Sequence, residues 1–168
     1  MVERIFFDMD GVLADFNRGV RELGGVEPAP QGPEWTPRCD DAMWSGIQKV
    51  DHFYDRLELM PDTKALFDEL YEKYGDRVQI LSAVPKPKRN IPGAKDDKIN
   101  WVHRLLGEDI QVNIVLREQK PEYCRNKDCI LIDDFDENIE SWREYGGTGI
   151  QFISAEETRR LLEEMGVL

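Results

Sequence analysis

Five short apolar runs recur along the chain, and each has the length and composition of a buried β-strand. They lie at residues 4–8, 77–82, 112–116, 129–134 and 149–154 and are rich in Ile, Val, Leu and Phe. Continuous apolar runs of this length are typical of parallel strands that are covered on both faces. The pattern therefore predicts five strands in a mostly parallel sheet.

The segments between these runs have the spacing of amphipathic helices. Residues 61–75 begin with proline and end in glycine, and residues 96–107 and 154–166 also end in glycine. The last of these segments opens with Ser154 and Glu157 in the pattern of a capping box. Strands that alternate with helices predict an α/β fold, here a Rossmann-like core with helices flanking the sheet.

One stretch, residues 24–60, does not follow this alternation. It is rich in Gly, Pro and Trp and contains no clear strand. A structureless linker of this length is unusual inside a compact chain. We therefore interpret residues 16–60 as a small helical cap inserted after the first strand, and residues 1–15 and 61–168 as the catalytic core.

The composition limits the class of protein. The 168 residues are 40% hydrophobic and 33% charged, which is ordinary for a soluble globular domain. No apolar run approaches the roughly 20 residues that a bilayer span needs, and no leader segment precedes the first run. The chain has only three cysteines, which we expect to be reduced thiols. We expect a cytoplasmic protein with no membrane partner, whose oligomeric state, monomer or dimer, stays open.

The charge limits the partners. The formal net charge is −12, so a broad basic surface that could bind duplex nucleic acid is not expected. A small anionic substrate is compatible with this charge if the site supplies local positive charge or a metal ion. The charge therefore leaves a small anion as the expected partner.

Polar side chains follow four of the predicted strands at the point where each strand ends. In chain order they are Asp8, Asp10, Ser82, Lys120, Asp133 and Asp134. Ligands of open α/β sheets bind at this edge, so we expect these side chains to converge. Carboxylates this close repel one another, and a hard cation such as Mg²⁺ relieves the repulsion. The set predicts a phosphate-transfer site in which Asp133 and Asp134 hold Mg²⁺, directly or through water.

The same residues predict a mechanism. Asp8, at the end of the first strand, is the candidate nucleophile that attacks phosphorus and becomes an aspartyl-phosphate. Asp10 is the candidate acid and base for the leaving group and the hydrolytic water. Ser82 and Lys120 would bind the phosphoryl oxygens. Gly11 would let the backbone leave the strand tightly beside the metal.

These motifs resemble a known superfamily. "DMDGV" after an apolar strand, the hydroxyl residue ending "QILS", a later lysine and "LIDD" are similar to the motif set of the haloacid dehalogenase superfamily. Most of its members are Mg²⁺-dependent phosphatases with an aspartate nucleophile. "DMDGVLADF", "FYDRLELMPDTKALFDEL", "DDKINWV", "IVLREQK" and "LIDDFDENI" resemble the 5'(3')-deoxyribonucleotidase family more closely, over about residues 4–153.

The resemblance implies further site residues. It implies Lys98 as a second lysine that binds phosphate and Phe16 as an aromatic residue against the nucleobase. It also implies Asp8 and Asp10 as metal ligands, the latter through its backbone carbonyl. Residues 83–95 and the cap depart from the family's pattern, and these segments select the substrate.

The aromatic and basic residues outside the motifs can each be interpreted in two ways, as structural residues or as residues that contact substrate. In the predicted cap, Trp44 and Phe53 are candidates for substrate binding by stacking, although aromatic side chains more often serve packing. The basic residues of the loop after the second strand could form a solvated loop or a flap that attracts phosphate. They are Lys86, Lys88, Arg89 and Lys95.

The leading functional interpretation is a Mg²⁺-dependent phosphomonoesterase for nucleoside monophosphates. The preferred substrates would be deoxyribonucleotides with a 5' or 3' phosphate, hydrolysed through an aspartyl-phosphate. One alternative keeps the chemistry and changes the substrate to a sugar phosphate or a phosphorylated oligonucleotide end. A second alternative is a non-catalytic binding module, but such a module is expected to have lost part of the acidic set.

Overall fold

A five-stranded parallel sheet forms the centre of the computed structural model, which describes all 168 residues. Its strands are β1 (Arg4–Phe7), β2 (Val78–Ala83), β3 (Val112–Val115), β4 (Cys129–Asp133) and β5 (Thr148–Gln151). Their spatial order is β3-β2-β1-β4-β5, and every neighbouring pair is parallel. The predicted fold class is confirmed. The last strand stops before residue 154 because Ser154 caps the helix that follows.

Six α-helices connect and flank the strands. They are α1 (Phe16–Glu22), α2 (Pro37–Gln48), α3 (Pro61–Tyr74), α4 (Ala94–Leu105), α5 (Asp136–Glu144) and α6 (Ala155–Glu164). The Ser154 hydroxyl accepts a hydrogen bond from the Glu157 N–H at 3.1 Å. The other half of the capping box is not formed, because the Glu157 carboxylate pairs with Arg160. None of the helices combines the length and apolarity needed to cross a membrane.

Five short 3-10 helices complete the chain. They are η1 (Gly32–Glu34), η2 (Tyr54–Arg56), η3 (Gly75–Arg77), η4 (Pro87–Arg89) and η5 (Arg117–Tyr123). The link from β3 to β4 therefore contains η5 where the other crossovers have an α-helix. Pro121 lies inside η5 and lacks the N–H that a longer helix needs there.

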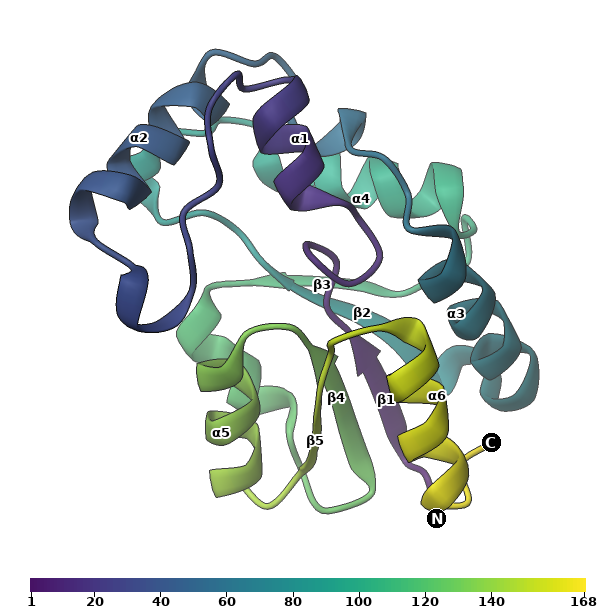
Figure 1. Cartoon of the computed structure of the whole chain (residues 1–168). Helices are drawn as coiled ribbons and strands as arrows, with labels where there is room; N and C mark the ends of the chain where they lie inside the picture. The colour runs from purple at the N-terminus through teal and green to yellow at the C-terminus, as the bar shows by residue number, and fades with distance from the viewer.

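Alternating side chains divide the core between the two faces of the sheet. Ile5, Phe7 and Ile80 point toward the larger cluster, which α3, α4 and α6 cover. Phe6 and Leu131 point to the smaller cluster, which α5 and η5 cover with help from Trp142 and Tyr123. Figure 1 shows α3 and α6 on one side of the strands and α5 on the other. This burial on both faces makes the strand ends rigid supports for the site.

The predicted cap, residues 16–60, contains α1, α2, η1 and η2 and no strand. In Figure 1, α1 and α2 lie beyond the carboxyl ends of the strands, and both chain termini lie at the opposite end of the sheet. The two connections to the core run side by side, since Asp15 N–H donates to the Glu58 carbonyl and Met60 N–H to the Leu13 carbonyl, both at 2.8 Å. The division into cap and core stays a prediction.

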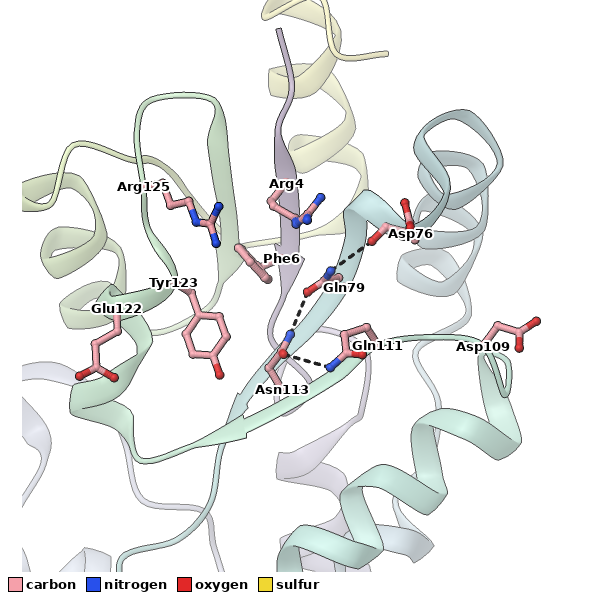
Figure 2. Close-up of a pocket in the computed structure, with 10 residues that line it drawn as sticks. All are labelled: Arg4, Phe6, Asp76, Gln79, Asp109, Gln111, Asn113, Glu122, Tyr123 and Arg125. Atoms are coloured by element: carbon pink, nitrogen blue, oxygen red, sulfur yellow. Dashed lines mark hydrogen bonds between the residues drawn. The ribbon is translucent and has the colours of Figure 1, made fainter.

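A hollow of about 670 Å³ lies away from the carboxyl ends of the strands. Figure 2 shows it on the face of Phe6, where no helix covers the amino-terminal halves of β1, β2 and β3. Hydrogen-bonded amides of Gln79, Asn113 and Gln111 form its floor. Because its lining contains none of the predicted catalytic residues, we place the candidate site at the opposite half of the sheet.

Candidate active site

Parallel strand pairing brings the predicted acidic residues together. In the register, Phe7 of β1 lies opposite Ile80 of β2 and Ile132 of β4. Asp8 continues this alignment, because its N–H donates to the Ile132 carbonyl at 2.9 Å. Asp133 is the last residue of β4. Residues far apart in the sequence therefore meet where the strands end.

Three carboxylates form a compact cluster at this edge. Asp8, Asp133 and Asp134 each offer one oxygen, and these three atoms lie within 4.8 Å of one another. Asp133 is fully buried and Asp8 is 7% exposed. The charges are therefore held close together in a region that excludes most water.

Burial and mutual repulsion favour the protonated forms of two of these carboxyls. Burial, and then the charge of Asp133, raise the pKa of Asp8 well above its usual range, although Lys120 acts in the opposite direction. The same two causes raise the pKa of Asp134 to about 7. Without a cation, the cluster therefore retains protons that free aspartates would release.

The donor set fits a hard divalent cation, which removes this repulsion. Asp8, Asp133 and Asp134 would hold the ion. Both oxygens of Asp133 already accept hydrogen bonds within the chain. Asp8 and Asp134 have fewer such bonds and therefore keep more lone pairs for a metal.

A sharp backbone turn brings Asp134 against the loop that follows β1. Gly11 has a φ of +79°, and a Cβ atom built on it would lie 2.3 Å from Oδ2 of Asp134. A side chain here would therefore be strained and would also displace the carboxylate. The turn therefore leaves room for the Asp134 carboxylate, and the metal site beside Gly11 stays a prediction.

Lys120 lies between two of the clustered carboxylates. It belongs to η5, is 2% exposed, and donates to Asp8 Oδ1 at 3.1 Å and to Asp133 Oδ2 at 2.7 Å. Burial alone would lower its pKa, but the charges of Asp8 and Asp133 outweigh burial and raise it. The ammonium of Lys120 therefore stays charged. It supplies local positive charge at this edge of an otherwise acidic protein.

Lys98 contacts the loop that follows β1, residues 8–15, which is the predicted catalytic loop. It is fully buried in α4 and donates to Asp10 Oδ2 at 2.8 Å, to the Ser82 hydroxyl at 2.9 Å and to the Ala83 carbonyl at 2.7 Å. Oδ1 of Asp10 is buried and has no hydrogen-bond partner. The predicted acid and base and the predicted hydroxyl thus meet at one lysine.

Two polar residues of the site lie outside the sequence prediction. Asn138 donates to Asp133 Oδ2 at 3.0 Å. Gln31, from the cap segment, donates to Asp134 Oδ2 at 3.3 Å. The "DDFDEN" run placed Asn138 near the site, but no pattern in residues 24–36 distinguishes Gln31.

The predicted aromatic residues do not form one group. Phe16 packs against Phe53 and Tyr54, with ring centroids 5.8 Å and 6.4 Å away. Phe53 is only 1% exposed, so its ring belongs to the core, which argues against the prediction that it contacts substrate. Trp44 lies elsewhere, in α2, where Arg89 stacks over it at 5.8 Å. Phe16 stays half-buried beside the catalytic loop.

The basic residues of the loop after β2 do not all behave in the same way. Lys86, Lys88 and Lys95 are exposed, as in a solvated loop. Arg89 instead turns toward α2, where it pairs with Asp40 and Asp41. The loop is therefore attached to the cap segment through one arginine.

Comparison with known proteins identifies the fold. No family model and no curated protein matches the chain. It is similar to the crystal structure of a hydrolase from Streptococcus pneumoniae TIGR4, with TM-score 0.54, 12% identity, and 96% of this chain and 98% of that chain covered. It is similar to L-2-haloacid dehalogenase from Xanthobacter autotrophicus with chloropropionic acid covalently bound, with TM-score 0.53, 11% identity and coverage of 100% and 85%.

A further dehalogenase structure has TM-score 0.58 and 12% identity, with 96% of this chain and 97% of that chain covered. At such identities the likeness establishes the fold alone. The chain therefore has the haloacid dehalogenase fold. The narrower likeness to the 5'(3')-deoxyribonucleotidases rests on the sequence motifs.

Proposed function

We propose that the protein is a Mg²⁺-dependent phosphomonoesterase that hydrolyses nucleoside monophosphates through an aspartyl-phosphate. The observation that carries this proposal is the cluster of Asp8, Asp133 and Asp134, whose carboxylate oxygens lie within 4.8 Å of one another. Lys120 donates to the cluster and would supply a fixed positive charge, and Asp10, whose charge acts on Asp8 and Asp134, would supply an acid.

Each residue has a defined part in the reaction. An oxygen of Asp8 attacks phosphorus, the bond from phosphorus to the leaving oxygen breaks, and Asp10 gives its proton to that oxygen. Water then attacks the phosphorus of the aspartyl-phosphate while Asp10 takes the proton of the water. The bond to Asp8 breaks, so inorganic phosphate leaves and both aspartates return to their starting forms.

Two further residues stabilise the phosphoryl group. Lys120 uses two of its three N–H donors on Asp8 and Asp133 and keeps one for a phosphoryl oxygen. Ser82 accepts a hydrogen bond from Lys98 and keeps its own proton to donate. When bound, Mg²⁺ would supply charge that neutralises the phosphoryl oxygens and the surrounding carboxylates.

The acidic cluster favours phosphoryl transfer over dehalogenation, although dehalogenases share the fold. Displacement of halide from a haloacid needs a carboxylate nucleophile, which Asp8 could provide. The additional carboxylates would repel the negative charge of such a substrate unless a cation neutralised them. A metal-neutralised cluster instead suits a phosphate monoester, which brings several anionic oxygens.

The proposal for the nucleotide rests on the motif resemblance and on Phe16. This half-buried ring lies directly after the catalytic loop, within the aromatic group of the cap segment. A deoxyribonucleoside monophosphate offers both a phosphate for the acidic edge and a base for this ring. A second substrate class, sugar phosphates, has no observation that favours it.

Release of phosphate, or of chloride in the case of 2-chloropropionate, tests the proposal. Deoxy- and ribonucleoside 5'- and 3'-monophosphates, a sugar phosphate, a phosphorylated oligonucleotide and 2-chloropropionate would each be assayed with Mg²⁺ and with EDTA. We expect turnover of the deoxyribonucleotides only with Mg²⁺, and a loss of about 1,000-fold or more in Asp8→Asn. The matched control is Asp109→Asn, an exposed aspartate at the distant hollow, which should keep full activity.

The other outcomes are equally informative. Turnover confined to sugar phosphates or the oligonucleotide would keep the chemistry and overturn the proposed substrate. Metal-independent chloride release from 2-chloropropionate would identify a dehalogenase instead. No turnover of any compound by folded protein with bound Mg²⁺ would contradict the proposed activity altogether.

A further inference from the structure

Lys98 has no hydrogen-bond donor left for a substrate. An ammonium group has three N–H donors, and those of Lys98 go to Asp10, Ser82 and the Ala83 carbonyl at 2.7–2.9 Å. Its side chain is fully buried. A phosphate could reach this lysine only by displacing one of these partners. This arrangement differs from that of Lys120, which keeps one donor.

The ring of Tyr54 covers the same ammonium. The Lys98 Nζ atom lies 4.5 Å from the centroid of the Tyr54 ring, which is within the range of a cation–π interaction. Tyr54 is 2% exposed, so water is largely excluded from the contact. Such interactions are stronger when they are desolvated. Tyr54 therefore contacts the ammonium in addition to its three hydrogen-bond acceptors and helps to keep water from it.

Helix α4 holds the two partners in place together. Lys98, Trp101 and Arg104 are spaced three apart and therefore lie along one side of the helix. Trp101 Nε1 donates to the Leu57 carbonyl at 2.9 Å, and Arg104 donates to the Asp55 carboxylate at 2.9 Å. Both bonds fix η2, the segment that carries the tyrosine, against the helix that carries the lysine.

The effect of this arrangement falls on Asp10. Lys98 binds Oδ2 of the carboxylate, while Oδ1 is buried without any partner. One oxygen is thus held by the protein and the other stays available for a proton transfer. A carboxylate held in this way keeps one orientation, which is what proton transfer to a fixed leaving group requires.

We propose that Lys98 and Tyr54 are a positioning pair that fixes Asp10, and that Lys98 does not bind the substrate phosphate. This inference rests on the proposed function, in which Asp10 is the acid and base. It assigns different roles to the two buried lysines: Lys120 binds phosphate and Lys98 orients Asp10. It also gives a cap residue a part in catalysis that is separate from substrate recognition.

Paired substitutions at Tyr54 separate the ring from the hydroxyl. Tyr54→Phe keeps the ring and should keep kcat within about 2-fold, because the cation–π interaction needs only the aromatic face. Tyr54→Leu removes the ring and should lower kcat by about 10- to 30-fold with KM nearly unchanged. The control is Tyr74→Leu, which removes a ring beside Lys73 and Arg77 at the other end of the molecule and should leave kcat unchanged.

Inhibition by inorganic phosphate tests the role of the lysine. Lys98→Met should lower kcat by about 100-fold or more and leave the inhibition constant of phosphate nearly unchanged. Lys120→Met should weaken phosphate inhibition strongly. Equal weakening of inhibition in both variants would overturn the proposal, as would a Tyr54→Leu enzyme with unchanged kcat or a Tyr54→Phe enzyme as slow as Tyr54→Leu.

Covalent labelling tests the pair without any turnover. Amine acetylation followed by mass spectrometry should leave Lys98 protected in wild type and Tyr54→Phe and expose it in Tyr54→Leu. Labelling of Lys98 in folded wild type would contradict the buried contact. Wild-type protein that hydrolyses no phosphate ester would refute the proposed function, and labelling would then still decide whether Tyr54 shields Lys98.

Discussion

At the scale of single residues, Gly11 has a conformation and a neighbour that only glycine tolerates. Gly11→Ala adds a Cβ atom 2.3 Å from Asp134 Oδ2 at a φ of +79°. We expect weaker Mg²⁺ binding by titration calorimetry and a free energy of unfolding at least about 1 kcal/mol lower than in the control. The control is Gly93→Ala, which has the same φ but open space around the added atom. Equal effects of the two substitutions would show that the loss of stability comes from backbone strain and not from the contact with Asp134.

Lys120 is a second single residue whose substitution should have a large effect on stability. Lys120→Met leaves Asp8 and Asp133 buried side by side without their shared partner. In EDTA we expect a loss of about 3–5 kcal/mol in the free energy of unfolding by urea denaturation, because breaking a buried pair strands a charge. Lys64→Met, which removes the half-buried partner of the exposed Asp68 on α3, should change little. Added Mg²⁺ should recover part of the loss, and a stability equal to wild type would contradict the structure.

The sequence predicted the acidic residues of the site better than their partners. Asp8 and Asp133 follow apolar runs, and strand-end position alone predicts that such residues converge. The hydrogen bonds of Lys98 to Asp10 and of Gln31 to Asp134 join residues 88 and 103 positions apart. No local pattern encodes contacts of this kind, because they depend on how the cap segment and α4 pack.

At the scale of elements, the apolar runs predicted the strands to within a few residues because burial on both faces requires continuous hydrophobic sequence. The helix over residues 61–74 was predicted equally well, since Pro61 and Gly75 mark its ends. The 3-10 helix η5 was not predicted. Its sequence is short and polar and includes Pro121, so it has no helical periodicity, and its place in the fold depends on Lys120 reaching the site.

Arg89 connects two elements that the sequence did not link. Its side chain is 13% exposed, pairs with Asp40 and Asp41 of α2, and stacks over Trp44. We expect Arg89→Ala to loosen the loop and α2 together, with faster amide hydrogen exchange in α2 and a loss of about 1–2 kcal/mol in the free energy of unfolding.

The control for Arg89 is Arg18→Ala on α1, an exposed arginine whose partner Glu22 lies one turn away on the same helix. It should leave exchange in α2 unchanged, because it joins no second element. If the two variants behaved alike, the contact between Arg89 and α2 would not stabilise α2. Faster exchange confined to residues 84–93 would show that α2 is held by its other contacts.

At the scale of the whole molecule, the site joins segments from most of the chain. Asp8 directly follows the first strand, Lys98 lies in the middle of the chain and Asp134 in its last third, so the site exists only in the folded state. The three clustered aspartates lie in a protein whose net charge is already −12. Their repulsion therefore acts on the stability of the entire fold, and a cation that binds them stabilises the fold by mass action.

This coupling predicts how stability depends on pH. Below about pH 3.8 the Asp134 carboxyl holds its proton in both the unfolded and the folded state, whereas the folded pKa is about 7. Between these values the unfolded chain ionises while the folded protein keeps the proton, so stability falls as pH rises through this window. Asp8 acts in the same direction. In EDTA, thermal unfolding should therefore occur several degrees lower at pH 8 than at pH 5.

Magnesium should reverse this trend, because it binds the ionised carboxylates of the folded protein. At 100 times its dissociation constant the ion would add about 2.7 kcal/mol to the free energy of unfolding at pH 8, and little at pH 5, where the sites hold protons. Asp134→Asn removes one of the repelling charges, so its stability in EDTA should vary less with pH and respond less to Mg²⁺. A wild-type protein whose midpoint is the same at both pH values, with and without Mg²⁺, would mean that these carboxylates are not strained together in the folded state.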